Sequence, residues 1–342
     1  MPSYHPFGHS PHLATKVPNL PEDDHDAHTP APVPEAFSNG SFGSLLEPVL
    51  KQVVGDQLGE ISWFRTDWQR GGAITGFSNW RLEDGEEVPV VVKLPVPPCE
   101  RHWLVSLQVH EHVAPVLYAH GDVLGGYDLA WVIMQRVPHG PIGSAWKGAE
   151  FDLLVDVASR FYKATQDHAL TGKPLQRDWQ HIFELSRKHV HDHDVPDSKH
   201  WSKTLKKARK KLPEWLKVWS DRPMDGWCHG DLHLANALSL APAPAGPALL
   251  IDYAEVRVGH WVEDAVYFEH LYWSVRDRLQ GRKLCKMIAH ARKDLGFELD
   301  PHWADYAQIK RNLLAMSTPA MLQHDGDPNH LRACLEVLDA HV

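Results

Sequence analysis

The residues best suited to chemistry gather in two stretches of the chain, Cys228 to Asn236 and a shorter one that ends at Asp252. Asp231 and Asn236 fall on one predicted loop. Transfer of a phosphoryl group needs a carboxylate to orient the attacking hydroxyl, and oxygen ligands to hold Mg²⁺ against the phosphates. Asp231 can meet the first need, and Asn236 with Asp252 can meet the second.

A cation for the phosphates is the other part that this chemistry requires. Lys93 interrupts the apolar run Val90 to Leu94, and a lysine in a buried strand is costly unless its ammonium is paired. Glu100, which opens the next predicted helix, is the nearest partner in sequence, and Glu111 is the alternative. Both can also be ordinary exposed helix carboxylates, and we prefer Glu100.

Two histidines of the first stretch allow another interpretation. His229 and His233 have the spacing of helical HxxxH metal sites, but Gly230 disfavours a helix, and no third ligand of matching spacing is evident. We therefore expect these histidines to orient the loop by hydrogen bonds. Taken singly, Asp231 or Asp252 could be a helix cap or a turn residue.

The elements that must position these residues change character along the chain. Apolar alternation predicts strands over 61–64, 73–82 and 88–94, and Asp84-Gly85 between the last two is a hairpin signal. A helix over 100–108 and short strands over 113–118 and 129–134 follow. After Pro138 helical spacing takes over, near 154–164, 205–219, 262–279, 283–295 and 303–316. Short strands at 227–228 and 248–251 interrupt the helices.

Composition bounds the class of protein. The chain has 342 residues, 43% hydrophobic and 23% charged, which suits a globular protein of two lobes or domains. Its net charge of -9 makes nucleic acid an unfavourable main partner. Four cysteines without a CxxC pair suit a cytoplasmic location, and we expect neither export nor a membrane anchor. Residues 1–40, rich in proline and histidine, predict an extended arm.

Over about 60–275 the sequence resembles the aminoglycoside phosphotransferase and choline kinase-like superfamily, small-molecule relatives of the protein kinases. The resemblance depends on Lys93, on His229-Gly230-Asp231-Leu232-His233-Leu234-Ala235-Asn236, and on Ile251-Asp252-Tyr253-Ala254 followed by Gly259 and Asp264. The two motifs together are specific, whereas either alone is weak.

The resemblance implies an α+β, two-lobed protein-kinase-like fold, with an antiparallel-sheet lobe at about 41–136 and a larger helical lobe at about 137–342. It implies ATP and Mg²⁺ as cofactors. Asp231 is then the catalytic base, Asn236 and Asp252 bind the metal, and Lys93 contacts the phosphates. The linker from Met134 through Arg136 would hold the adenine by its backbone.

Three departures from the family pattern matter. The loop around Gly71 and Gly72 is not the protein-kinase GxGxxG, so phosphate contact there is inferred from position and flexibility. Gln135 stands where relatives often carry glutamate. Tyr253-Ala254 replaces the phenylalanine-glycine of protein kinases, which argues against an ordinary protein kinase.

The acceptor side carries weaker signals. Glu263, Asp264 and Glu269 fall on a predicted helix after the second motif, where carboxylates near the N-terminus are favoured in any case. If Glu263 or Glu269 points into the cleft, an acceptor bearing an amine or quaternary ammonium becomes the expectation. Trp261, Tyr267 and Trp273 could cradle such a cation, although core packing is their default role.

We therefore expect an ATP- and Mg²⁺-dependent phosphotransferase that acts on a hydroxyl of a small molecule. A catalytically silent nucleotide-binding regulator is the main alternative, and the intact set of Lys93, Asp231, Asn236 and Asp252 argues against it. A metal-dependent hydrolase built on the histidines near 229–233 is the second alternative.

Overall fold

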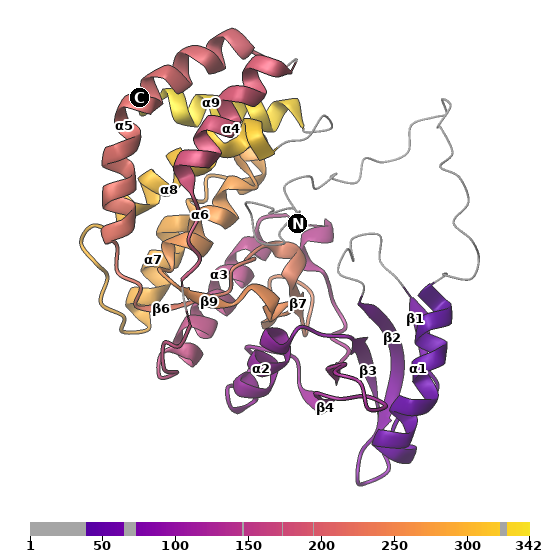
Figure 1. Ribbon diagram of the computed structural model, residues 1–342. Helices are drawn as coiled ribbons and strands as arrows, with labels where there is room; N and C mark the ends of the chain where they lie inside the picture. Colours follow the sequence, from indigo (N-terminus) through magenta and orange to yellow (C-terminus); the bar gives the residue numbers. More distant parts are fainter. Residues whose placement is uncertain (1–38, 65–72, 146, 173, 194, 322–326) are drawn as a thin grey trace. The chain divides into compact units, whose positions relative to one another are not determined.

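The computed structural model describes residues 39–64, 73–145, 147–172, 174–193, 195–321 and 327–342 (Figure 1). These residues divide into two compact units. The sheet unit comprises the described residues up to Ile142 together with Ala235–Val256, and the helical unit comprises Gly143–Leu234 and Arg257–Val342. The expected arm lies outside the described residues up to position 38. The lobe boundary near 136 stays a prediction, and the segment Ala235–Val256 groups with the sheet unit.

The sheet unit is built on one antiparallel sheet of five strands in the order β1-β2-β3-β5-β4. Its strands are β1 (Ser62–Phe64), β2 (Ile74–Arg81), β3 (Glu87–Leu94), β4 (Leu117–Gly121) and β5 (Trp131–Gln135), with helices α1 (Asn39–Val54) and α2 (Pro98–Ser106). A separate antiparallel pair comprises β7 (Ala237–Ser239) and β8 (Ala248–Leu250). Short 3₁₀ helices span Gly55–Gln57, Leu107–Val109 and Tyr253–Glu255, and two more, Ile142–Ala145 and Leu234–Asn236, join the units.

The two faces of the large sheet differ because side chains alternate along each strand. On one face Ile74, Trp80, Val92 and Ile133 are buried in a core that also contains Leu50 of α1. Figure 1 shows α1 beside β1 and β2. The opposite face carries the partly exposed members of the alternation, and the lysine of β3 is one of them. Burial of one face thus leaves the other available for chemistry.

The hairpin that sets the register of β2 and β3 follows its sequence signal. Gly85 has a φ of +88°, which glycine adopts at little cost, and the Glu86 backbone N–H donates to the Asp84 carboxylate at 3.0 Å. In the resulting register Lys93 lies opposite Thr75 and Val91 lies opposite Phe77. Directly opposite residues share a face, so these four side chains lie on the face away from α1.

The helical unit contains seven α-helices among its described residues. They are α3 (Ala149–Thr165), α4 (Trp179–Asp192), α5 (Ser198–Asp221), α6 (Val262–His270), α7 (Leu284–Asp294), α8 (Trp303–Met321) and α9 (Pro328–Asp339), with a 3₁₀ segment at Trp273–Leu279. The short antiparallel pair β6 (Gly226–Cys228) and β9 (Arg257–Gly259) completes the unit. Residues such as Phe151, Phe161, Trp201 and Phe268 are fully buried, which is the apolar stripe that helical spacing predicts.

Most predicted elements are confirmed with shifted ends. The strand expected over 113–118 is wrong in position, because the observed strand begins at Leu117 and Pro115 has no N–H to donate to a ladder. The helix expected over 262–279 ends at His270 and continues as the 3₁₀ segment. Helices α1, α4 and α9 and strands β7 and β9 were not expected. In the described part of the chain, no helix is both long and apolar enough to span a membrane.

A substitution at Gly76 of β2 tests the packing of the buried sheet face. A Cβ added at Gly76 would overlap the Ile61 side chain and lie 3.0 Å from Trp63 Cε3. We therefore expect Gly76→Ala to lower the free energy of unfolding by about 1–3 kcal/mol, as overpacked sites do. The matched control is Gly226→Ala, where a new Cβ meets nothing within 4 Å. Urea unfolding measures both, and equal stability of the two variants would contradict the packing described above.

Candidate active site

The catalytic-loop candidate belongs to the helical unit and follows β6 directly. Gly230 adopts a φ of +87°, and the loop places Asp231 with only 5% of its surface exposed. The backbone N–H groups of His229 and Gly230 both donate to the Asp264 carboxylate, at 2.7 and 2.9 Å. Two buried backbone donors are therefore satisfied by one side chain, which fixes the loop to the first turn of α6.

The Asp231 carboxylate is held from two sides. The Tyr267 hydroxyl donates to Oδ1 at 2.7 Å, and Nε2 of His233 lies 3.3 Å from Oδ2. Burial acts to raise the pKa of Asp231, but the contacts with His233 and Tyr267 and the charge of His229 outweigh it and hold the pKa well below its usual value. The carboxylate is thus kept ionised, with both oxygens oriented.

Lys93, the predicted phosphate-binding cation, lies in the sheet unit. Lys93 Nζ contacts both carboxylate oxygens of Glu100, at 2.6 and 2.8 Å, and Glu100 is 1% exposed. Burial acts to lower the pKa of Lys93, but the charges of Glu100 and Asp252 raise it above its usual value, so the ammonium is retained. The structure therefore pairs Lys93 with Glu100, and Glu111 is an exposed residue.

The predicted metal ligands lie together in the sheet unit. Asn236 precedes β7 and Asp252 follows β8, and these strands pair with Ala237 opposite Leu250. The Ile251 backbone N–H donates to the Asn236 carbonyl at 3.0 Å, which brings the two ligand candidates to the same end of the pair. A carboxylate and an amide oxygen are the hard ligands that Mg²⁺ prefers, so the donor set fits this ion.

Asp252 has an unusual backbone. Its φ of +62° and ψ of +67° place a residue other than glycine in the left-handed region. Such a conformation costs free energy unless the surroundings enforce it, and it is common at functional sites. The Tyr253 hydroxyl donates to the carbonyls of Val113 and Leu250 at 3.1 and 3.0 Å, which fixes the chain on both sides of the turn.

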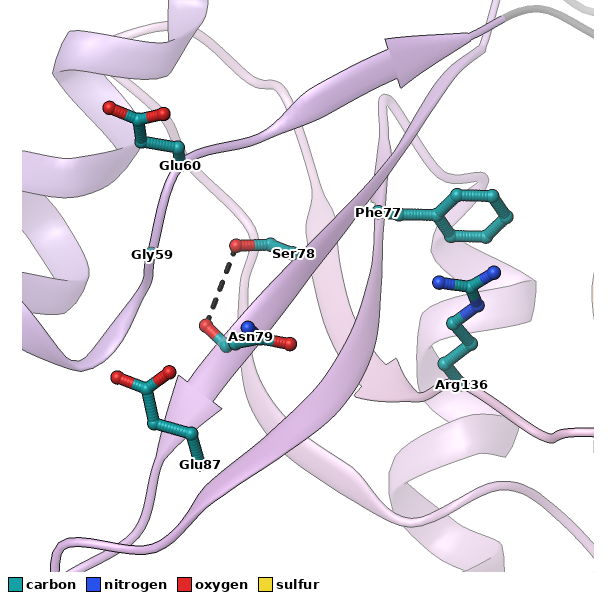
Figure 2. A pocket seen from close by; sticks show the side chains of 7 residues that line it. All are labelled: Gly59, Glu60, Phe77, Ser78, Asn79, Glu87 and Arg136. Atoms are coloured by element: carbon teal, nitrogen blue, oxygen red, sulfur yellow. Dashed lines mark hydrogen bonds between the residues drawn. The ribbon is translucent and has the colours of Figure 1, made fainter.

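The nucleotide-side candidates continue along the sheet face that carries Lys93. Met134 of β5 lies opposite Val91 and is buried. Arg136 follows β5, with its guanidinium carbon 3.8 Å from the centre of the Phe77 ring. Figure 2 shows both side chains at one side of a hollow of about 380 Å³, which is also lined by Gly59, Glu60, Ser78, Asn79 and Glu87. The predicted glycines Gly71 and Gly72 lie outside the described residues.

The three carboxylates considered for the acceptor all have partners in the helical unit. Asp264 holds the loop, Glu263 accepts from Arg222 Nη2 at 2.8 Å, and Glu269 pairs with Arg311 at 2.7 and 2.9 Å. Burial acts to raise the pKa of Glu263, but the surrounding cations, Arg222 foremost, lower it to about 2. A role for these residues in binding an acceptor stays a prediction, and the structure gives each of them a partner of its own.

The contact of Tyr267 with Asp231 is the feature that sequence reasoning missed. From the sequence alone, Tyr267 is expected only as a ring that could face a cation. The usable signal was its spacing, because Tyr267 follows Asp264 by three residues and so lies on the same side of α6. Within the described residues, no group of three or more His, Cys, Asp or Glu side chains is arranged to hold a metal ion.

Removal of the Glu100 charge tests the ion pair of the sheet unit. Glu100→Gln leaves the buried Lys93 ammonium without its counter-ion, and we expect the free energy of unfolding to fall by roughly 3 kcal/mol. The matched control is Glu111→Gln, which changes an exposed carboxylate and should stay within about 0.5 kcal/mol of the parent. Urea unfolding followed by circular dichroism measures both variants, and a Glu100→Gln protein as stable as the control would disprove the pairing.

Comparison with solved structures places this arrangement among kinase-like folds. A microcompartment-associated aminopropanol kinase superposes with a TM-score of 0.57 at 16% identity, over 86% of this chain and 95% of the other. A putative aminoglycoside phosphotransferase from Ralstonia eutropha gives 0.53 at 14% identity, over 86% and 96%. A spectinomycin phosphotransferase solved with ADP and spectinomycin gives 0.50 at 13% identity, over 87% and 93%.

The fold is therefore α+β and protein-kinase-like, with a small antiparallel sheet and a larger helical part, as the resemblance implied. No curated protein matches the sequence. The model of the phosphotransferase enzyme family, however, matches residues 71–309, which contain every motif described above. The chain belongs to the phosphotransferase enzyme family that includes the aminoglycoside phosphotransferases.

Proposed function

We propose that this protein transfers the γ-phosphoryl group of ATP to a hydroxyl of a small molecule, with Mg²⁺ as cofactor. The observation that carries the proposal is the Lys93–Glu100 ion pair, which leaves an ammonium charged on the open face of the sheet, within the electrostatic influence of Asp252. A fixed cation beside a metal-binding carboxylate is the arrangement that a nucleoside triphosphate requires.

The sheet unit supports nucleotide binding through a continuous surface. Phe77, Val91 and Met134 share the face that carries Lys93, and they provide an apolar floor on which a purine can lie. In this proposal the backbone after Met134 binds the base, with carbonyl groups accepting hydrogen bonds from it and N–H groups donating to it. Mg²⁺ bound by Asp252 and Asn236 would neutralise charge on the phosphates.

The helical unit supports the role of Asp231 as catalytic base. Its carboxylate stays ionised and is oriented by Tyr267 and His233, so it can accept a hydrogen bond from the acceptor hydroxyl and align the oxygen for attack. As the P–O bond to the acceptor forms, the bond from the γ-phosphorus to the bridging oxygen of ATP breaks, ADP leaves, and the hydroxyl proton passes to Asp231. A carboxylate of low pKa contributes more by orientation than by strong basicity, which suits a loose phosphoryl transition state.

Loss of the Asp231 carboxylate tests the proposed activity. Asp231→Ala should lower turnover by about 10²-fold or more, with nucleotide affinity little changed, because the residue contacts the acceptor and not the nucleotide. The assay is ATP consumption with Mg²⁺ against a panel of small hydroxyl compounds, with nucleotide affinity measured by calorimetry. Asp294→Ala, an exposed carboxylate of α7, is the matched control.

Each outcome of this assay decides something. Full turnover in purified Asp231→Ala would remove Asp231 from the mechanism. Nucleotide binding without turnover on any acceptor, in the parent protein, would favour the silent regulatory alternative. Turnover that persists after magnesium is removed by a chelator would contradict the cofactor assignment.

A further inference from the structure

A buried group of cations lies beside the catalytic loop, and the proposed reaction does not use it. Lys310 of α8 is 5% exposed, and its Nζ lies 5.2 Å from the ring centres of both Trp179 and Trp219. Among the residues that the structure describes, no carboxylate pairs with this ammonium and no acceptor hydrogen-bonds to it. A buried amine in an aromatic setting without a counter-ion is costly.

Arg222 is a second buried cation of the same group, and one of its N–H groups has no acceptor within the described residues. Arg222 is 6% exposed; its guanidinium carbon lies 3.6 Å from the centre of the Trp219 ring, and Nη2 donates to Glu263. Its Nε has no hydrogen-bond partner within the described residues. Buried arginine donors are normally satisfied, so this N–H indicates a place for an acceptor that the protein itself does not supply.

Glu263 is the carboxylate that these cations share. Arg222 contacts it at 2.8 Å and Arg257 Nη2 lies 3.8 Å from its other oxygen, while Lys310 acts on it through space. Burial and the charges of Arg177, Arg257 and Arg222 lower the pKa of Lys310, and the charge of Glu263 acts to raise it. Asp264 also lies within the electrostatic influence of Arg257, so we base the inference on Lys310 and Arg222 alone. The Lys310 ammonium and Arg222 Nε both lie buried without a hydrogen-bond partner among the described residues, and an anion would satisfy both.

The buried cations lie near the candidate catalytic loop in the helical unit. Arg257 lies opposite Cys228 in the β6–β9 pair, directly before the catalytic loop. Arg177 and Arg257 both act electrostatically on Tyr267, whose hydroxyl is 2.7 Å from Asp231. The cations and the candidate base therefore share neighbours within the helical unit.

We propose that Lys310 and Arg222 bind an anionic group, a carboxylate or a phosphate, that is carried by the acceptor. This inference rests on the proposed function, since it names the class of acceptor: a hydroxy acid or a phosphorylated alcohol. Arginine forks and ammonium groups are the usual partners of both anions, and burial strengthens the interaction. The carboxylates that would instead bind a cation are already engaged by Arg222 and Arg311.

The site is tested first without turnover, using sulfate as the probe. At a sulfate concentration on the order of 10 mM, and against chloride at equal ionic strength, we expect the Tm of the parent protein to rise by about 2 °C or more. Lys310→Met should lose this rise. Lys286→Met, which removes an exposed lysine of α7, should keep it and so reports the general effect of sulfate on stability.

A measurement on the parent protein covers the case in which Lys310→Met does not fold. Burial, Arg177, Arg257 and Arg222 lower the pKa of Lys310 to about 7, opposed by Glu263. Because sulfate keeps its charge, the sulfate-induced rise in Tm should shrink between about pH 6 and about pH 9, as the ammonium loses its proton. A rise independent of pH, or equal in Lys310→Met and Lys286→Met, means an adventitious ion only and overturns the site.

Activity then distinguishes the acceptor from a free anion. Paired hydroxy acids and their neutral amides are offered with ATP. We expect the acids to be phosphorylated and Lys310→Met to raise their KM by about 10-fold or more, with the KM for ATP unchanged. Preference for the amides, with sulfate binding intact, would make the site one for a free anion and overturn the acceptor assignment. Sulfate binding without any phosphorylation would contradict the proposed function and leave the anion site standing.

Discussion

The buried carboxylate of Asp264 is the group on which the geometry of the helical unit depends. It accepts hydrogen bonds from two consecutive backbone N–H groups of the candidate catalytic loop and one from the Tyr162 hydroxyl at 3.1 Å. Gly230 can present its N–H there because it adopts a positive φ. The same helix then extends Tyr267 to Asp231, so α6 fixes both the backbone and the side chain of the loop.

In the sheet unit, the main constraint is that a charged lysine lies next to a hydrophobic core. Alternation along β3 buries Val90, Val92 and Leu94 on the α1 side and turns Lys93 to the other face. Glu100 meets Lys93 there at the start of α2. The rigid apolar face therefore determines where the charged face can present its ammonium, and a one-residue change of register would exchange the two.

Local signals explain how much of this was predictable. The Asp84-Gly85 turn, the alternation of β2 and β3 and the two motifs were enough to predict the hairpin, the Lys93–Glu100 pair and the candidate base. Long-range contacts were not predictable in this way: Asp264 meets His229 only because β9 pairs with β6, and nothing in the local pattern of residues 257–259 marks a strand. Helix α4 was missed because histidines and charged residues separate its apolar positions. Helix α9 does carry Leu331, Leu335 and Leu338 at helical spacing, and this signal was overlooked.

The three carboxylates of α6 show why the charge of a side chain does not by itself reveal its partner. Seen in the sequence, Glu263, Asp264 and Glu269 suggested a surface for a cationic acceptor. In the structure Asp264 binds backbone, and the two glutamates neutralise arginines from outside the helix. Near Glu263, the Lys310 ammonium has no carboxylate partner among the described residues, and Arg222 Nε has no acceptor there. A buried charge or donor without a partner is costly, and this cost is the reason for proposing that an anion completes the site.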